Sequence, residues 1–292
     1  MTLPRYKGDV FHRMLGRGLE QISPRFGRYF FRPETPADWS SPGQTPPKPY
    51  ILVPPMTGQT RFAAGDELVL GITLFGEARR HLMTLFIALE RLGLDHGLTN
   101  GKGRFQIQGV TQLTPDGPLP LFTEDQWQSD AKTVTAAAIF TTAPAAADPV
   151  RLELFTPLRL KNQGALVRGQ LPLSIFIDRL IGRLNTLAAI YCGGILLPPE
   201  EKSALVTLAR TARIIRDETR WIDWDRDDGT PRQQSRRGKA IQFGGLMGSI
   251  SYTNIPAVLL PWLSLGQWIG VGGKSSFGLG LYNLAIDEEV IE

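Results

Sequence analysis

Histidine side chains can transfer protons near neutral pH, and this sequence contains three of them. His12 lies near the start of a segment with helical periodicity, close to Tyr6 and Lys7. His81 follows two arginines near the start of another such segment, whereas His96 sits in a glycine-flanked turn and is expected to be exposed. Each of the three could also be an ordinary surface histidine, so residue type alone does not select among them.

A glycine-rich segment near the carboxyl end could bring backbone N–H groups close to phosphate oxygens. Its members are Gly270, Gly272, Gly273, Lys274, Ser275, Ser276, Phe277, Gly278 and Gly280. Gly273-Lys274-Ser275 matches the end of a nucleotide phosphate loop, but Trp268 stands where the first glycine of that motif should be. Two interpretations therefore remain, a phosphate-binding loop and a turn that lets two strands pack.

Basic residues are grouped in short clusters, although the formal net charge is only +4, from 32 Lys and Arg against 28 Asp and Glu. A site for a polyanion must therefore be a local patch. The clusters are Arg232, Arg236, Arg237 and Lys239, then Arg79 with Arg80, and Lys102 with Arg104. We predict a nucleic-acid backbone groove if they converge with Lys274, while ordinary solvated charge is the alternative.

Several classes of protein are disfavoured by the composition. A single cysteine, Cys192, permits no intrachain disulfide and no cysteine-rich zinc site, which favours a cytoplasmic protein without a metal or cofactor. The amino terminus does not resemble a signal peptide. Prolines and a glycine interrupt the main apolar stretch, residues 255–271, so we expect no membrane span.

Hydrophobic periodicity predicts an α+β protein in two halves, residues 1–148 and 149–292, joined by an Ala/Pro-rich linker at residues 142–149. A proline-rich loop, residues 33–58, interrupts the first half. Helices are predicted at residues 8–21, 77–92, 176–191 and 199–213. Strands are predicted at residues 50–53, 67–75, 101–110, 134–140, 150–158, 241–252 and 281–286.

The glycine-rich segment and its flanks carry a family resemblance. Residues 263–282 resemble the carboxyl-terminal motif of the CRISPR repeat-processing endoribonucleases of the RAMP superfamily. Residues 244–248 and 232–237 resemble preceding blocks of that family, and residues 47–55 resemble part of its amino-terminal half. The sequence is therefore similar to this family over most of its length.

This resemblance implies two tandem ferredoxin-like, RRM-like domains, the first with a proline-rich insertion and the second carrying the glycine-rich loop. It also implies binding of a CRISPR repeat and metal-independent cleavage, in which a ribose 2′-OH attacks the adjacent phosphorus. His12 lies near the position of an acid/base histidine in several members, and Tyr6, Lys7 and His81 are further catalytic candidates. Gly270 stands where many members have a histidine, so that residue's role has no counterpart here.

Three functions stay open on this basis. The first is an endoribonuclease that cuts precursor CRISPR RNA and retains the product. The second is a non-cutting subunit that binds mature CRISPR RNA within a larger effector complex. The third, more remote, is a nucleotide-binding enzyme. The expected partners are CRISPR repeat RNA and other subunits of a CRISPR effector complex.

Overall fold

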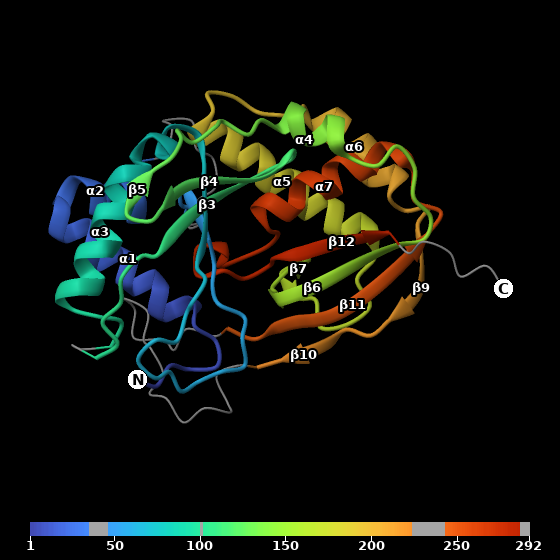
Figure 1. The fold of residues 1–292 in the computed structure, drawn as a ribbon. Coiled ribbons are helices and arrows are strands. Elements are labelled where there is room, and N and C mark those ends of the chain that lie inside the picture. Colours follow the sequence, from blue (N-terminus) through green and yellow to red (C-terminus); the bar gives the residue numbers. More distant parts are fainter. Residues whose placement is uncertain (35–45, 100–101, 224–242, 287–292) are drawn as a thin grey trace.

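The protein is described by a computed structural model that covers residues 1–34, 46–99, 102–223 and 243–286 (Figure 1). Helices and antiparallel sheets are both present, which confirms the predicted α+β class. Among the helices of these ranges, none combines the length and apolar character needed to cross a membrane.

The main sheet of the second half is antiparallel with the strand order β10-β11-β6-β12, and β9 also pairs with β11. A separate hairpin pairs β7 (Lys161–Asn162) with β8 (Ala165–Leu166). The strands of the main sheet are β6 (Val150–Leu158), β9 (Arg213–Asp217), β10 (Arg220–Ile222), β11 (Gly245–Thr253) and β12 (Tyr282–Ile286). The helices of this half are α5 (Leu173–Tyr191), α6 (Pro199–Leu208) and α7 (Leu260–Ile269). After β6 the chain forms α5 and α6, then the strand segments β9, β10 and β11, then α7 and β12. Apart from the additional helix α6, this is the order of a ferredoxin-like domain.

Helices α5 and α7 lie together along this sheet (Figure 1) because each presents an apolar face to it. On α5, buried residues recur at helical spacing, as in Phe176, Leu180, Leu184 and Leu187. On β6, Val150, Leu152 and Leu154 alternate with partly exposed residues. These two periodicities build the larger hydrophobic core.

The first half has its own smaller core between helices and a two-stranded sheet, β1-β2. Its elements are α1 (Gly8–Ile22), α2 (Pro24–Phe31), β1 (Tyr50–Val53), β2 (Gly71–Leu74), a 3-10 helix η1 (Gly76–His81) and α3 (Leu82–Asp95). A three-stranded sheet follows, made of β3 (Gly109–Thr114), β4 (Gly117–Thr123) and β5 (Gln126–Trp127). Ahead of α1, the described chain makes a single isolated bridge between Thr2 and Arg61.

Two predicted strands are wrong in whole or in part. Of the strand predicted at residues 101–110, only Gly109 and Val110 belong to β3, and residues 104–108 are in no strand. Residues 134–140 fall largely within a helix, α4 (Ala136–Thr142), whose N-cap residue Thr135 accepts a hydrogen bond from the Ala138 N–H at 3.2 Å. The three alanines after this cap favour a helix, and a short apolar run does not distinguish strand from helix. Helix α4 packs on α7, where the Phe140 and Trp262 rings meet at 5.0 Å.

Candidate active site

The glycine-rich loop connects α7 to β12 and turns back on itself through a 3-10 helix, η3 (Ser275–Phe277). At its base, the Val271 N–H donates to the Gly280 carbonyl at 2.8 Å. Gly278 has a φ of +89°, and a Cβ on it would overlap the ring of Pro54, just beyond β1. Glycine is needed there because the loop backbone is docked directly on the first half of the chain.

Several backbone N–H groups that the sequence suggested for phosphate are already bonded within the second half of the chain. The Gly273 N–H donates to Arg159 at 3.1 Å, the Gly280 N–H to Pro157 at 3.1 Å and the Gly278 N–H to Ser275 at 2.8 Å, each time to a carbonyl. The packing interpretation is therefore confirmed for this part of the loop, whereas phosphate binding stays a prediction. The outer part of the loop, with Gly273 exposed and Lys274 and Ser276 half-buried, is the part that a polyanion can reach.

His12 lies beneath this loop, on the face of α1 that contacts η3, and is only 7% exposed. Its ring stacks on Phe277 with 3.8 Å between the ring centroids. Its Nδ1 is 3.0 Å from the Ser276 carbonyl oxygen and 3.0 Å from the Tyr50 hydroxyl, and its Nε2 is 3.0 Å from the Lys48 Nζ. Three distant parts of the chain therefore meet at one imidazole.

These contacts fix the tautomer of His12. A lysine ammonium has only donors, so Nε2 must be the acceptor that faces Lys48. Nδ1 then carries the hydrogen and donates to the Ser276 carbonyl. The ring is neutral, with a lone pair at Nε2.

Burial and neighbouring cations favour this neutral form. Burial first, then the Lys48 ammonium and the Arg13 charge, lower the pKa of His12 to about 3, against the opposing effect of the Ser276 hydrogen bond. An imidazole with so low a pKa is unprotonated at pH 7, and it is a weak base as long as these surroundings persist.

Lys48 and Tyr50 were not among the sequence candidates. They lie at the end of the proline-rich loop and the start of β1, 36 and 38 residues from His12. The Lys48 ammonium also lies over the Phe31 ring at 4.4 Å and near the Phe277 ring at 5.8 Å. The one available signal was a lysine and a tyrosine within residues 47–55, which resemble a family block, but spacing cannot reveal a contact with α1.

Tyr6 and Lys7 approach the same region from the residues before α1, and their polar atoms bind carbonyls. The Tyr6 hydroxyl donates to the Phe277 carbonyl at 2.7 Å, and burial raises the pKa of Tyr6 well above its usual value. The Lys7 ammonium donates to the Thr57 carbonyl at 2.8 Å and the Arg5 carbonyl at 3.3 Å, and burial lowers the pKa of Lys7. These contacts hold the loop and the helix start in place.

Comparison with known proteins gives a family for the half that carries the loop. The profile of the family described as CRISPR-associated endoribonuclease Cas6 matches residues 152–282. These residues form a Cas6 domain. A second profile, described as the AF_1859_N N-terminal domain, matches residues 1–137, and no curated protein matches the chain.

Solved Cas6 structures share the fold over nearly the whole chain. A Thermus thermophilus Cas6 in its product complex is 17% identical, with a TM-score of 0.60 over 98% of this chain and 96% of that one. The same Cas6 described without a product is 15% identical, with a TM-score of 0.56 over 96% and 90%. A chain of a partial Cas6-RT-Cas1–Cas2 complex is 16% identical, with a TM-score of 0.62 over 99% of this chain and 44% of that longer one.

The predicted tandem ferredoxin-like fold is thereby confirmed. The family of that profile is described as a CRISPR-associated endoribonuclease. Neither finding identifies catalytic residues. The candidates among them are chosen from the contacts of individual side chains.

The other predicted residues that the structure describes make their contacts with groups other than His12. The His81 ring meets the edges of Phe26 and Tyr29 at 5.1 and 5.5 Å, in a cluster of α2 rings. Arg80 pairs with Glu77 at 2.8 Å beside it, and Arg79 is in the same turn of η1. Lys102 and Arg104 follow α3, where the Thr99 N–H donates to the Lys102 carbonyl at 3.1 Å. The cluster Arg232, Arg236, Arg237 and Lys239 lies outside the described residues.

The described part of the chain contains no group of three His, Cys, Asp or Glu side chains arranged to hold a metal ion. The contacts of His12 with Lys48 and Tyr50, beneath the outer part of the glycine-rich loop, make this group the candidate active site.

Proposed function

We propose that this Cas6-family chain cuts CRISPR repeat RNA without a metal ion, by attack of a ribose 2′-OH on the adjacent phosphorus. The observation that carries this proposal is the contact of a neutral imidazole with an ammonium 3.0 Å away, beneath a loop suited to RNA backbone. A base, a cation and a phosphate-binding surface are the parts that the reaction needs from a protein.

Proton transfer in this reaction is shared between the two side chains. The 2′-oxygen forms a bond to phosphorus while the bond from phosphorus to the 5′-oxygen breaks, leaving a 2′,3′-cyclic phosphate. His12 Nε2 accepts the proton of the 2′-OH, and the Lys48 ammonium stabilises the phosphate charge and gives a proton to the leaving 5′-oxygen. The distance of 3.0 Å between the two nitrogens lets both reach one phosphate.

Substrate binding has to separate these two nitrogens first. Lys48 is only half-buried and has a flexible stem, so a phosphate at the mouth of the site attracts its ammonium away from His12. This movement frees the Nε2 lone pair. It also removes one of the charges that lower the pKa of His12, which makes the imidazole a stronger base when RNA is present.

Binding of the RNA backbone would fall to the outer loop around Lys274, and to the arginine and lysine clusters where they converge with it. The product stays bound in this proposal, because these backbone contacts do not involve the bond that is cut. A chain of a Cas6-RT-Cas1–Cas2 complex shares the fold. We accordingly propose association with other CRISPR proteins as a further property of this chain.

A non-cutting RNA-binding subunit is the second candidate, and the 7% exposure of His12 favours it. The test is incubation with repeat RNA in excess EDTA, followed by analysis of the product ends. His12→Ala should slow cutting by about 10²- to 10⁴-fold, as for loss of a general base, while binding changes little.

His81→Ala is the matched control, since it removes a histidine that packs on other rings. It should cut at nearly the wild-type rate. Dependence on Mg²⁺, or equal rates for the two variants, would contradict the proposed mechanism. Tight binding of uncut RNA by the wild-type protein would support the non-cutting subunit instead.

A further inference from the structure

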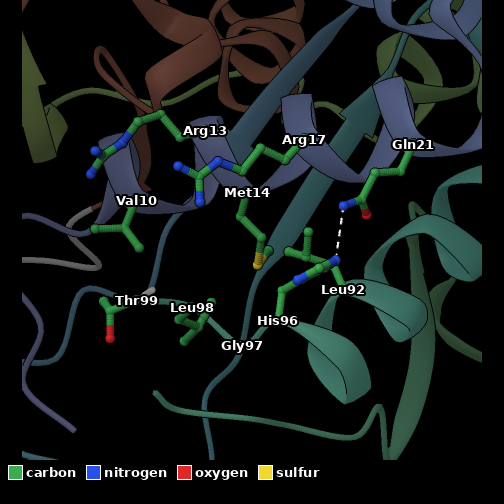
Figure 2. Close-up of a pocket in the computed structure, with 10 residues that line it drawn as sticks. All are labelled: Val10, Arg13, Met14, Arg17, Gln21, Leu92, His96, Gly97, Leu98 and Thr99. Carbon is green, nitrogen blue, oxygen red and sulfur yellow. Dashed lines mark hydrogen bonds between the residues drawn. The ribbon is translucent and has the colours of Figure 1, made fainter. Parts of the chain in front are cut away.

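A cavity of about 480 Å³ lies between α1, the helix that carries His12, and the end of α3 (Figure 2). Apolar side chains form its floor, where Val10 and Met14 from α1 face Leu92 and Leu98 from the other side. All four are at most 9% exposed, so this floor is small and polar groups provide most of the accessible lining. Figure 2 shows the Met14 thioether directed into this space. A flat, apolar ring fits such a floor, and a thioether packs well against one.

The rim of the cavity is cationic and polar. Arg13 and Arg17 stand one turn apart on α1, and Figure 2 shows their side chains side by side above the floor. Arg13 pairs with Asp9 at 3.2 Å, but with 53% of the Arg13 side chain exposed this pair holds it weakly. Two arginines at this spacing repel each other, and a phosphate between them would remove the repulsion.

Two side chains that can form hydrogen bonds, Gln21 and His96, lie at the far end of the cavity. The Gln21 Nε2 donates to the His96 Nε2 at 2.9 Å across the opening, linking the two helices. Both side chains are exposed and can exchange this bond for bonds to a ligand. An amide and an imidazole together provide donors and acceptors, which suits the mixed edge of a nucleobase.

We propose that this cavity holds one unpaired nucleotide of the RNA, with its base on the apolar floor and its phosphate between Arg13 and Arg17. The inference rests on the proposed function and adds to it a site that recognises one base of the RNA. Its volume lies within the range of about 300–1,000 Å³ usual for small-ligand pockets, which accommodates a single flipped-out nucleotide and excludes a stacked duplex.

The position of the cavity connects it to the cutting site. Arg13 directly follows His12, and after burial and Lys48 its charge is among the causes that lower the pKa of His12. In the proposed arrangement, a strand whose phosphate lies at His12 continues past Arg13 into the cavity. Binding there would fix the register of the strand and so select which phosphate meets His12.

The test is a scan of the repeat RNA in which each unpaired nucleotide near the cut is made abasic in turn. With the wild-type protein, one position should lose about tenfold in affinity, the usual effect of removing a stacked base. With Arg17→Ala the intact RNA should bind several-fold more weakly, and the loss at that one position should shrink. Arg91→Ala, which removes an exposed arginine from α3, is the control and should leave the scan unchanged.

A second arm uses each of the four ribonucleoside 5′-monophosphates alone, to distinguish RNA from a free nucleotide. Weak binding that Arg17→Ala abolishes supports the site when the RNA scan also responds. Monophosphate binding without a response in the scan would assign the cavity to a free nucleotide and overturn the proposal. RNA binding with no sensitive position would overturn the cavity assignment alone, whereas absence of RNA binding would overturn the proposed function as well.

Discussion

The charge state of His12 is set by its surroundings and has a consequence for stability. The folded protein keeps the imidazole neutral because burial, Lys48 and Arg13 lower its pKa to about 3. In the unfolded chain the same side chain has a pKa of about 6.5. Between these two values the unfolded state binds the extra proton, so the contribution of His12 to stability is present above about pH 6.5 and is lost as the pH falls.

We expect this linkage to remove about 2 kcal/mol from the free energy of unfolding between pH 7 and pH 5. Urea unfolding of the wild-type protein and of His12→Gln at both pH values measures it. The difference between the two pH values should be smaller in the variant, which has no titrating ring. An equal pH dependence in both proteins would show that folding does not lower the pKa of His12.

The sequence indicated part of this site in advance. His12 and the loop of residues 270–280 could be singled out because each has a residue type or composition suited to RNA chemistry. Lys48 and Tyr50 could not, since they contact His12 only after β1 has packed beside α1. The order of elements places residues on helices and strands, but it does not determine which side chains meet.

The glycine-rich loop acts as an element with a defined path, and its glycines are not equivalent. Gly278 combines a φ of +89° with close packing on Pro54. Gly273 lies outside that backbone region, is exposed, and its nearest neighbour to an added Cβ is the Arg159 oxygen at 4.0 Å. A methyl group should therefore be tolerated at Gly273 and should not be tolerated at Gly278.

Gly278→Ala should lower the free energy of unfolding by about 1–3 kcal/mol through backbone strain, with the clash adding to it. Gly273→Ala is the control and should change it by less than about 0.5 kcal/mol. Denaturant midpoints of the two variants provide the comparison. Similar midpoints for both would mean that the loop does not need its docked path for folding.

At the level of elements, long patterns were predicted better than short ones. Helix α5 was recognised because its apolar residues recur over five turns, a signal that no other element type produces. Helix α4 was mistaken for a strand, and β9 and β10 were missed within a charged, exposed stretch. Their conformation depends on pairing with β11, which local sequence does not encode.

The two halves of the molecule are joined across several separate contacts. The Tyr6 hydroxyl reaches the Phe277 carbonyl at 2.7 Å, and the Tyr191 hydroxyl donates to the Pro47 carbonyl at 2.6 Å. Helix α4, from the first half as predicted, buries Ile139 in the core of the second. Packing on this scale should hold the halves together without a covalent link.

Fragments 1–148 and 149–292, produced together, should accordingly copurify through a tag on one of them. Shortening the first fragment to residues 1–132 removes α4 and should weaken the association, because the contact of Phe140 with Trp262 is lost. Size-exclusion chromatography of the mixtures measures the difference. Separate elution of fragments 1–148 and 149–292 would show that the two halves associate only when they are covalently joined.

One contact of His12 has a consequence for how this site would vary among natural relatives. Its partner in the loop is the main-chain oxygen of residue 276, which any amino acid supplies. Selection on that contact should therefore leave position 276 free to drift. It should act instead at Gly8 and Gly278, where any side chain would push the loop away from its neighbours. Relatives should thus conserve the conformation of the loop by conserving residues that do not contact the imidazole.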